Sequence, residues 1–290
     1  MISEEPDRLI VTIKGGVKVD LEKYKVHSSP FTLRTADPSD TGHFHVKDDA
    51  EEKIKSLKER LSDLQNILFA DKRHALLVIL QGMDTSGKDG TIKHLFAGIN
   101  PQGFHVYSFK KPTEEERSRD FLWRVHQQVP AKGYITAFNR SHYEDVLVPQ
   151  VHGTLSDEEL KQRLQQIRHF EELLAAEGTR IVKLFLHISK DKQREKIRER
   201  LEQPKKFWKF DPADLAEREY WDAYQSAYEH TLTATSSEHA PWYWIPAHHK
   251  WYRDYVVLQI LVHELESLKL KYPELKAAPE EISRYLDQLK

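Results

Sequence analysis

Apolar residues between positions 47 and 69 recur at alternating spacings of three and four, which places them on one face of a helix. They are Ile54, Leu57, Leu61, Leu64 and Leu68. This pattern predicts an amphipathic helix over 47–69. Directly afterwards, residues 75–80 form an uninterrupted apolar run that is too short for a buried helix. A glycine-containing loop follows, so we predict that this run is a strand buried on both faces.

Four later apolar segments also have the length and composition of strands. They are residues 104–109, 134–138, 181–188 and 242–245. Most of them are separated by enough chain for a helical crossover, and strands that alternate with helices form a parallel sheet. Helix starts are marked by capping-box patterns at Thr113 and Ser156, and by Asp211 followed by proline at the first helical position. The chain is therefore predicted to have an α/β fold.

The first 46 residues have turn chemistry at several points, as at Gly15-Gly16, but no sustained period. We interpret residues 1–46 as an irregular arm that lies on the domain. No internal repeat with a period of about 20 to 50 residues and no low-complexity segment interrupts the rest of the chain. Residues 47–290 are therefore interpreted as one domain.

The composition excludes several classes of protein. No apolar run approaches the roughly 18 residues that cross a bilayer, so we expect no membrane span. The start of the chain carries acids where a signal peptide is basic and then apolar. The absence of cysteine excludes disulfides and thiol catalysis and suits a cytoplasmic protein. With 44 basic and 46 acidic side chains there is no global basic field, so we expect no nucleic-acid partner, and an anionic ligand must be held by a local cluster.

Residues 82–88 have the spacing of a phosphate-binding loop, in which a glycine and four residues precede Gly-Lys. This loop lies between the strand at 75–80 and a helix expected at 90–99. In that context successive backbone N–H groups and the positive end of the helix face an anion. Gly82 and Gly87 can adopt the positive φ that a tight anion site requires, and Lys88 supplies a mobile charge. A glycine turn with a surface lysine is the alternative.

Asp89 follows the lysine, where such a loop normally has the serine or threonine that ligates magnesium. Asp84 and Asp89 are then the hard oxygen ligands available. A carboxylate beside bound phosphate is repelled unless a cation lies between them, so we infer Mg²⁺ with Asp84 and Asp89 as candidate ligands. Alternatively, Asp89 is an acid that stabilises the start of the helix through the helix dipole.

A second polar segment, residues 138–145, follows the strand predicted at 134–138. In a parallel sheet its side chains emerge at the same edge as the phosphate loop. Arg140 is a candidate to grip a transferred phosphoryl group, whereas Asn139, Glu144 and Asp145 are candidates to position metal or acceptor. A surface helix start with a salt bridge is the alternative.

Nine lysine or arginine residues and four acids lie between positions 190 and 209. The run follows the strand at 181–188, breaks at Pro204 and resumes with Phe207 and Trp208 between lysines. A basic, interrupted segment at the edge that holds the phosphate loop is typical of a lid that excludes water and adds positive charge. We place this lid at about 190–220. A solvated helix face with acid–base pairs at helical spacing is the alternative.

Histidines and aromatic residues suggest two further interpretations. The histidine pairs at positions 43 and 45 and at 248 and 249 lack the spacing of a hydrolytic zinc site, so we expect them to be surface or packing residues. Four aromatic residues are candidates to clamp a nucleobase: Trp221, Tyr224, Tyr228 and Trp251. The helical spacing of the first three fits a core-facing helix equally well.

These segments together resemble the polyphosphate kinase 2 family, in particular the class that accepts both nucleoside mono- and diphosphates. The matching segments are residues 82–113, 138–147, 198–219, 221–232 and 241–257. They extend over nearly all of 47–268, and the first two combined are highly specific. Because that family is similar in fold to thymidylate kinases, the resemblance implies a P-loop three-layer α/β/α fold with a five-stranded parallel sheet and a helical lid.

The resemblance implies transfer of the terminal phosphoryl group of inorganic polyphosphate to AMP or ADP, giving ADP and ATP reversibly. It also implies Mg²⁺ as cofactor and a cytoplasmic homo-oligomer. Asp84 and Lys88 match the family's loop acid and lysine, and Arg140 matches its second-motif arginine, so these three are the candidate catalytic residues. The candidate phosphate- or nucleotide-binding residues are Gly82, Met83, Thr85, Ser86, Gly87, Asp89, Gly90, Lys111, Asn139, Ser141, Glu144, Arg200 and Lys209.

Position 139 departs from part of the family. Many members have aspartate where this chain has Asn139, which weakens the case for a metal ligand there. Asn139 with His142 and Glu144 nevertheless resembles the class that accepts mono- and diphosphates.

Two other functions use the same fold and loop. One is an ATP-dependent nucleoside monophosphate kinase, and the other is a nucleotide-binding module without catalysis. Transfer to AMP or ADP from polyphosphate alone is expected only of a polyphosphate-dependent kinase. A non-catalytic module has no need for a basic lid and should form no product from either donor.

Overall fold

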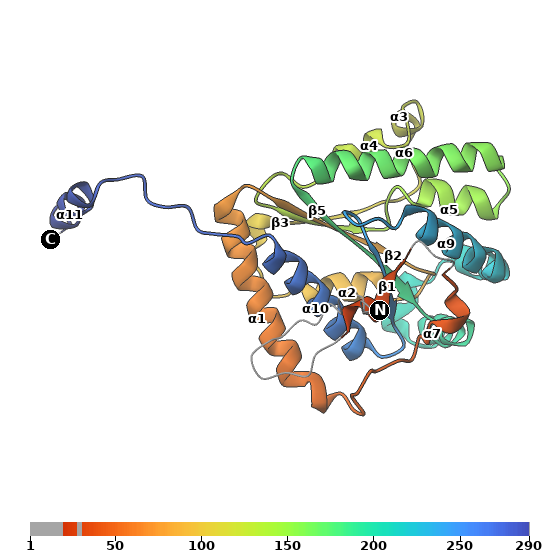
Figure 1. The fold of residues 1–290 in the computed structure, drawn as a ribbon. Coiled ribbons are helices and arrows are strands. Elements are labelled where there is room, and N and C mark those ends of the chain that lie inside the picture. Colours follow the sequence, from red (N-terminus) through yellow and green to blue (C-terminus); the bar gives the residue numbers. More distant parts are fainter. Residues whose placement is uncertain (1–19, 28–30, 290) are drawn as a thin grey trace, which may run out of the picture.

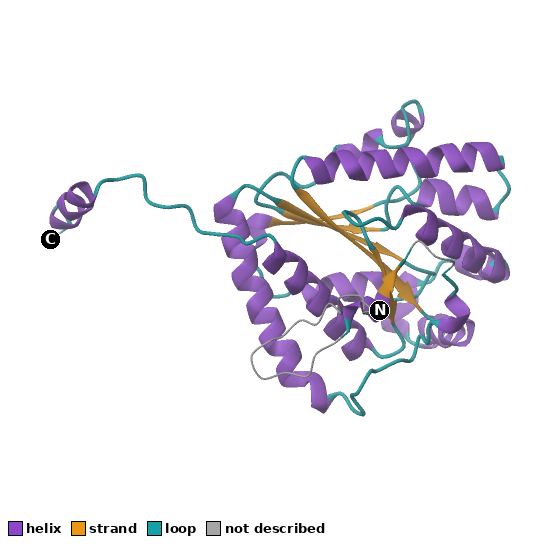
Figure 2. Ribbon diagram, viewed as in Figure 1, coloured by secondary structure: helices purple, strands orange, loops and turns teal. Residues whose placement is uncertain are grey.

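A six-stranded sheet forms the centre of the computed structural model, which describes residues 20–27 and 31–289 (Figures 1 and 2). The strands are β1 (Lys25–Val26), β2 (Ala75–Gln81), β3 (Phe104–Ser108), β4 (Ile135–Asn139), β5 (Thr179–His187) and β6 (Trp242–Pro246). Their order in the sheet is β1-β6-β5-β2-β4-β3. All five strands predicted from the sequence are present, and they pair in parallel.

The sheet has one strand more than predicted. Lys25 and Val26 of the predicted arm form β1, which pairs antiparallel with Tyr243 and Trp242 of β6. Two residues are too few to show an alternating pattern, so local sequence does not reveal this strand. The arm is therefore not wholly irregular: it supplies one edge of the sheet.

Helices cover both faces of the sheet. The α-helices of the described residues are α1 (Asp48–Asp71), α2 (Lys88–Leu95), α3 (Glu114–Arg117), α4 (Trp123–His126), α5 (Glu144–Val151), α6 (Asp157–Ala176), α7 (Lys190–Glu202), α8 (Pro212–Glu219), α9 (Trp221–Thr235), α10 (Lys250–Ser267) and α11 (Pro279–Asp287). In Figure 1, α1, α2 and α10 lie on one face and α5, α6 and α9 on the other. The predicted α/β/α layering is confirmed. Across residues 20–27 and 31–289, no helix is both long enough and apolar enough to pass through a bilayer.

Local capping chemistry sets several helix starts as the sequence predicts. Thr113 and Ser156 each form a complete capping box at the start of α3 and α6. Asp211 accepts a hydrogen bond from the Ala213 amide at the start of α8. Each cap satisfies amides that have no partner within the first helical turn, typically contributing about 1 kcal/mol.

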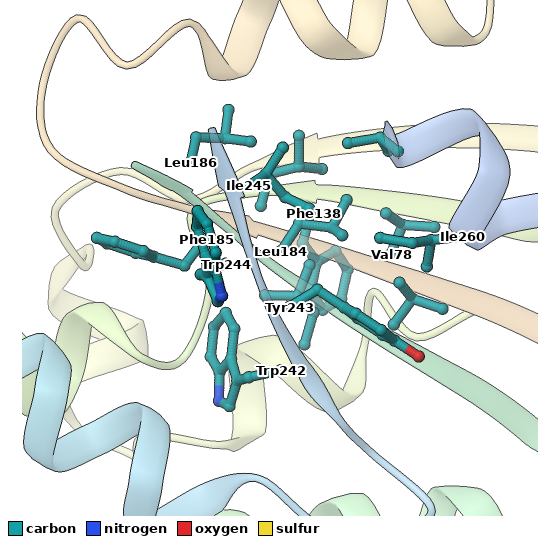
Figure 3. Close-up of a cluster of buried hydrophobic side chains, with 14 of the residues drawn as sticks. Val78, Phe138, Leu184, Phe185, Leu186, Trp242, Tyr243, Trp244, Ile245 and Ile260 are labelled. Carbon is teal, nitrogen blue, oxygen red and sulfur yellow. The ribbon is translucent and has the colours of Figure 1, made fainter. Parts of the chain in front are cut away.

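The centre of the sheet is mainly apolar. Every residue of β2 is buried, as predicted for a strand covered on both faces. Figure 3 shows Val78 of β2, Phe138 of β4 and Leu184 of β5 in the core with Ile260 of α10. Each such side chain contributes roughly 1.5–3 kcal/mol through burial, so the sheet is a stable support for the loops at its carboxyl edge.

The two ends of the chain differ in how they contact the domain. Leu21, Tyr24 and Val26 of the arm are buried, and the Tyr24 and Tyr252 hydroxyl oxygens lie 2.7 Å apart. Residues 1–19 and 28–30 of the predicted arm lie outside the described residues. At the other end, α11 lies apart from the rest of the chain in Figure 1.

Candidate active site

The phosphate-loop candidate connects β2 to α2 in the backbone conformation that its glycines permit. Gly82 and Gly87 have φ of +147° and +101°, and Thr85 also has a positive φ of +69°. A Cβ atom at Gly82 would lie 2.6 Å from the Leu186 carbonyl oxygen, so space as well as φ requires glycine there. The following helix begins at Lys88 rather than Gly90 and ends at Leu95 rather than Ile99.

Lys88 lies over this loop and is almost fully buried. Its Nζ donates hydrogen bonds to the carbonyl oxygens of Gly82 (2.7 Å) and Met83 (3.3 Å). Burial lowers the pKa of Lys88. The hydroxyls of Thr85 and Ser86 are buried and have no hydrogen-bond partner in the part of the chain that the structure describes. A ligand with acceptor oxygens, such as a phosphate, would satisfy these donors.

The second polar segment lies beside the loop, as predicted. The Arg140 backbone has a positive φ of +62°, and its guanidinium donates to Asp84 Oδ1 at 2.8 Å. Glu144 lies 3.9 Å from the same guanidinium. Burial raises the pKa of Glu144, although the charges of Arg140 and Lys88 oppose this. The structure thus brings Asp84, Lys88 and Arg140 together at one edge of the sheet.

The oxygen atoms available here fit a partly protein-held magnesium ion. The side-chain amide of Asn139 donates a hydrogen bond to the Asp89 carboxylate. Asp84 and Asp89 line the same cavity. No group of three or more histidine or acidic residues that could hold a metal ion occurs among the described residues. Mg²⁺ usually takes only one or two carboxylates and completes its coordination with water and substrate phosphates. Two carboxylates beside a phosphate loop therefore suit this ion.

A cavity of about 920 Å³ opens between the loop and the predicted lid. We call it the charged chamber, because eleven lysine and arginine residues and five acids line it. The cations are Lys88, Lys93, Lys110, Lys111, Arg140, Lys196, Arg200, Lys206, Lys209, Lys250 and Arg253. This is the local positive cluster that the balanced net charge requires of an anion-binding protein.

A second cavity of about 340 Å³ lies on the other side of Asp84 and Arg140. We call it the aromatic pocket, because Phe109, Tyr224 and Tyr228 line it together with apolar residues of α5. The two cavities share the side chains of Asp84, Phe109, Lys110, Lys111 and Arg140. They therefore meet where the loops after β2, β3 and β4 converge at the carboxyl edge of the sheet.

The predicted lid consists of α7, the 3₁₀ helix at Pro204–Lys209 and α8. Arg200 on α7 donates to Asp214 of α8 (2.7 Å) and to the Lys209 carbonyl oxygen (2.9 Å). Arg200 therefore also ties the parts of this segment together. The alternative of a solvated face applies to its outer side, where Arg194 and Asp191 form an exposed ion pair at 3.1 Å. The inner side lines the charged chamber.

Most of the other residues proposed for phosphate or nucleotide binding line one of the cavities. The aromatic pocket is lined by Gly82, Met83 and Glu144. The charged chamber is lined by Thr85, Gly87, Asp89, Gly90, Lys111, Asn139, Arg200 and Lys209. Ser86 and Ser141 line neither. Ser141 is fully buried, and its hydroxyl accepts a hydrogen bond from the Tyr143 amide at 3.2 Å, so it shapes its own loop.

Some residues of the site have no local sequence signal. Arg253 of α10 is 2% exposed and approaches the backbone of Gly87, and Arg124 of α4 lines the aromatic pocket. Both come from segments whose patterns indicate only helix. His248 accepts a hydrogen bond from the Ser189 amide at 3.1 Å, which helps to cap α7.

The four aromatic residues considered for a nucleobase clamp separate into two groups. Tyr224 and Tyr228 line the aromatic pocket. Trp221 is buried in the core, and Trp251 packs against Phe44 with ring centroids 6.1 Å apart. Periodicity alone does not distinguish the two groups, because all four lie on helices.

Comparisons with known proteins agree with this geometry. The sequence model of the family described as "Polyphosphate kinase 2 (PPK2)" matches residues 45–273. The chain is 51% identical to the AMP/ADP-polyphosphate phosphotransferase of Meiothermus ruber over 264 residues, covering 90% of this chain and 99% of the relative. It is 45% identical to the ADP-polyphosphate phosphotransferase of Rhodopseudomonas palustris, covering 89% and 90% of the two chains. The crystal structure of polyphosphate kinase 2 from Arthrobacter aurescens TC1 is similar with a TM-score of 0.88 and 42% identity, over 92% of this chain and 96% of that one.

Proposed function

This chain belongs to the polyphosphate kinase 2 family, and we propose that it transfers the terminal phosphoryl group of inorganic polyphosphate to AMP and ADP. The products are ADP and ATP, and the reaction is reversible. The observation that carries this proposal is the meeting of two unlike cavities at Asp84 and Arg140. A polyanionic donor suits the charged chamber, and a nucleotide acceptor suits the aromatic pocket.

Charge neutralisation, rather than proton removal, dominates the chemistry of this reaction. The acceptor is a phosphate oxygen that is already anionic near neutral pH, so no strong general base is needed. Lys88 and Arg140, which both line the charged chamber, stabilise the negative charge on the transferring group. Lys88 exchanges its hydrogen bonds to the Gly82 and Met83 carbonyls for bonds to phosphate oxygens. The buried hydroxyls of Thr85 and Ser86 donate to the same anion.

Asp84 and Asp89 are the residues that we propose to hold magnesium. When bound, this ion would neutralise part of the negative charge on the substrate phosphates. Asp84 also accepts a hydrogen bond from Arg140, which keeps the guanidinium at the junction of the two cavities. Asp84 therefore orients a catalytic cation in addition to any role toward the metal.

The aromatic pocket provides the acceptor site. Tyr224 and Tyr228 present ring surface to a base, and Leu147 and Val148 of α5 add an apolar wall. Lys110, Lys111 and Arg124 line the same pocket and neutralise the acceptor phosphates. A pocket of about 340 Å³ lies in the ordinary size range of small-molecule sites.

The segment at about 190–220 acts as the lid of the donor site. Lys206 and Lys209 on its inner side add positive charge opposite the phosphate loop. Closure over the donor excludes water, which would otherwise compete with the nucleotide as phosphoryl acceptor.

One progress curve tests the reaction. Protein, Mg²⁺, polyphosphate and AMP are mixed without any nucleoside triphosphate, and ADP and then ATP should appear. Addition of excess EDTA should stop both. Product from ATP and AMP but none from polyphosphate would instead show the ATP-dependent monophosphate kinase, and no product from either donor would show a non-catalytic module.

We also propose that the protein is a cytoplasmic homo-oligomer, as the family resemblance implies. Size-exclusion chromatography with light scattering measures the oligomeric state directly. A mass that is a multiple of the 34.1 kDa chain is expected, and a mass of one chain contradicts it.

A further inference from the structure

A buried ionic cluster lies between β5 and α6. Lys183 of β5 and Glu171 of α6 are 0% and 1% exposed, and Lys183 Nζ lies 2.6 Å from Glu171 Oε2. Lys183 also donates to the Tyr143 hydroxyl (3.0 Å) and to the Thr235 carbonyl oxygen (2.8 Å). The Tyr143 hydroxyl in turn donates to Glu171 Oε1 at 2.8 Å. These bonds join β5, α6, the end of α9 and the loop that carries Arg140.

Stability alone gives a weak reason for such a cluster. Transferring two charged groups from water into the core often costs more free energy than their mutual attraction recovers. Apolar residues of similar volume frequently support a fold equally well. Burial acts to raise the pKa of Glu171, but the charge of Lys183, together with the His142 ring beside it and the hydrogen bond from Lys183, holds that pKa below its ordinary value. The Glu171 carboxylate accepts hydrogen bonds from Lys183 and Tyr143 inside the core, and these directional bonds fix the geometry of the cluster.

Tyr143 links this cluster to the loop that carries Arg140. It lies three residues after Arg140 and directly before Glu144, the first residue of α5. Its amide donates to the Ser141 hydroxyl, and the Glu144 amide donates to the Ser141 carbonyl oxygen at 3.1 Å. At the other end of the loop, the Arg140 amide donates to the Leu80 carbonyl oxygen at 3.0 Å. A residue other than glycine, such as Arg140, persists at positive φ only where its surroundings hold it. The fully buried Tyr143 side chain is the part of this loop that is bonded to the cluster.

Thr235 links the same cluster to the acceptor side. It is the last residue of α9, and Tyr228 lies seven residues, or about two turns, before it on the same helix. The ring of Tyr143 packs edge-on against Trp242 with centroids 4.9 Å apart, and the Trp242 indole donates to the Thr235 hydroxyl at 2.9 Å. The cluster thus contacts the two elements that carry Arg140 and the pocket tyrosine.

We propose that Glu171 and Lys183 are positioning residues for phosphoryl transfer, which act through Tyr143 to aim Arg140 at the junction of the two cavities. This inference rests on the proposed function. Neither residue lines a cavity, so neither contacts substrate. Loss of the cluster should therefore lower kcat while leaving KM nearly unchanged, because binding groups stay in place and the transferring group is less well aligned.

The sharpest test compares two tyrosines. Tyr143→Phe removes a buried hydroxyl that donates to Glu171, and Tyr243→Phe removes one that donates to the buried Glu264 at 3.1 Å on the other face of the sheet. We expect Tyr143→Phe to lower kcat about tenfold with KM for ADP and polyphosphate within about twofold of wild type. Tyr243→Phe should leave kcat unchanged. Equal kcat in the two variants would overturn the proposal.

A second variant removes both charges at once. Glu171→Leu with Lys183→Met leaves no unpaired ion in the core, so thermal melting should stay close to wild type. Its kcat should fall at least as far as that of Tyr143→Phe, and wild-type kcat in the folded double variant contradicts the inference. If this variant does not fold, the comparison of kcat between Tyr143→Phe and Tyr243→Phe still tests the proposal.

A readout that needs no activity separates this inference from the proposed function. Amide hydrogen exchange over residues 139–144 should be faster in Tyr143→Phe than in wild type or Tyr243→Phe. Unchanged exchange shows that the cluster does not hold the loop. If the wild type transfers no phosphate from polyphosphate, the proposed function fails, and exchange alone then reports on the loop.

Discussion

The charged chamber and the aromatic pocket share Asp84 and Arg140 among their lining residues, but the rest of their linings differ in chemistry. The chamber is lined by long cationic side chains, and its lid lysines are partly exposed. The pocket is lined by aromatic and apolar residues, and Tyr228 is only 4% exposed. A flexible polymer of repeating charge needs charge density without a fixed shape, whereas a nucleotide needs a surface that fits its base.

Because of this difference, one edge of the sheet can bind two anionic substrates in separate cavities. Arg140 and Asp84 belong to both cavities. Under the proposed function, the phosphoryl group is therefore transferred beside these two side chains. Substitutions at this junction should abolish turnover. Substitutions inside one cavity should change the KM of one substrate alone.

The largest expected effect lies at the phosphate loop. Lys88→Ala removes a buried cation that stabilises the transferring group, so turnover should fall by at least about 100-fold. Steady-state assays with polyphosphate and ADP measure this. Lys132→Ala, an exposed lysine that lines neither cavity, is the matched control. Near wild-type turnover in Lys88→Ala would refute the assignment.

The next effect concerns the aromatic pocket. Tyr228→Ala removes a ring that we expect to contact the base, and stacking of a base on an aromatic side chain is worth about 1–3 kcal/mol. KM for ADP should rise about tenfold while KM for polyphosphate stays within about twofold. Tyr228→Phe keeps the ring and should behave like wild type. A rise in KM for polyphosphate instead would place the donor in this pocket.

A smaller effect is expected in the charged chamber. Lys206→Ala with Lys209→Ala removes two lid cations, and KM for polyphosphate should rise about fivefold at low salt and less at high salt, because salt screens exposed charges. KM for ADP should not change. The control Lys47→Ala with Lys55→Ala makes the same change of charge on exposed residues outside the chamber. If both double variants respond alike, net charge rather than the chamber is responsible.

The smallest effect should come from an acid in the lid. Glu199 accepts hydrogen bonds from Lys196 (2.6 Å) and Lys206 (3.0 Å), so Glu199→Gln frees two cations for the donor. KM for polyphosphate should fall about twofold, because ion pairs that are partly exposed contribute little free energy. The Lys196 hydrogen bond lowers the pKa of Glu199 to about 2, so its carboxylate is charged near neutral pH. The effect should therefore be the same at about pH 6 and about pH 8, and a variation with pH in this range contradicts the assignment.

Local patterns predict much of the fold. The spacing of Leu57, Leu61, Leu64 and Leu68 identifies α1, and the capping boxes at Thr113 and Ser156 identify two further helix starts. These features depend on neighbours in sequence, so a single chain reveals them. Strand β1 is different, because Lys25 and Val26 become a strand only by pairing with β6, more than two hundred residues later.

The phosphate loop and its lysine were determined by the sequence itself, because a tight anion site needs glycines and a cation at fixed spacing within one short segment. The association of Arg140 with that loop was also predictable, since parallel strands end at one edge. Only the tertiary structure decided that Arg253 approaches the loop, that Tyr228 rather than Trp251 lines the pocket, and that Lys183 and Glu171 meet beneath Tyr143. Helical patterns show that such residues lie on a helix, but the packing of distant elements decides which neighbours each side chain meets.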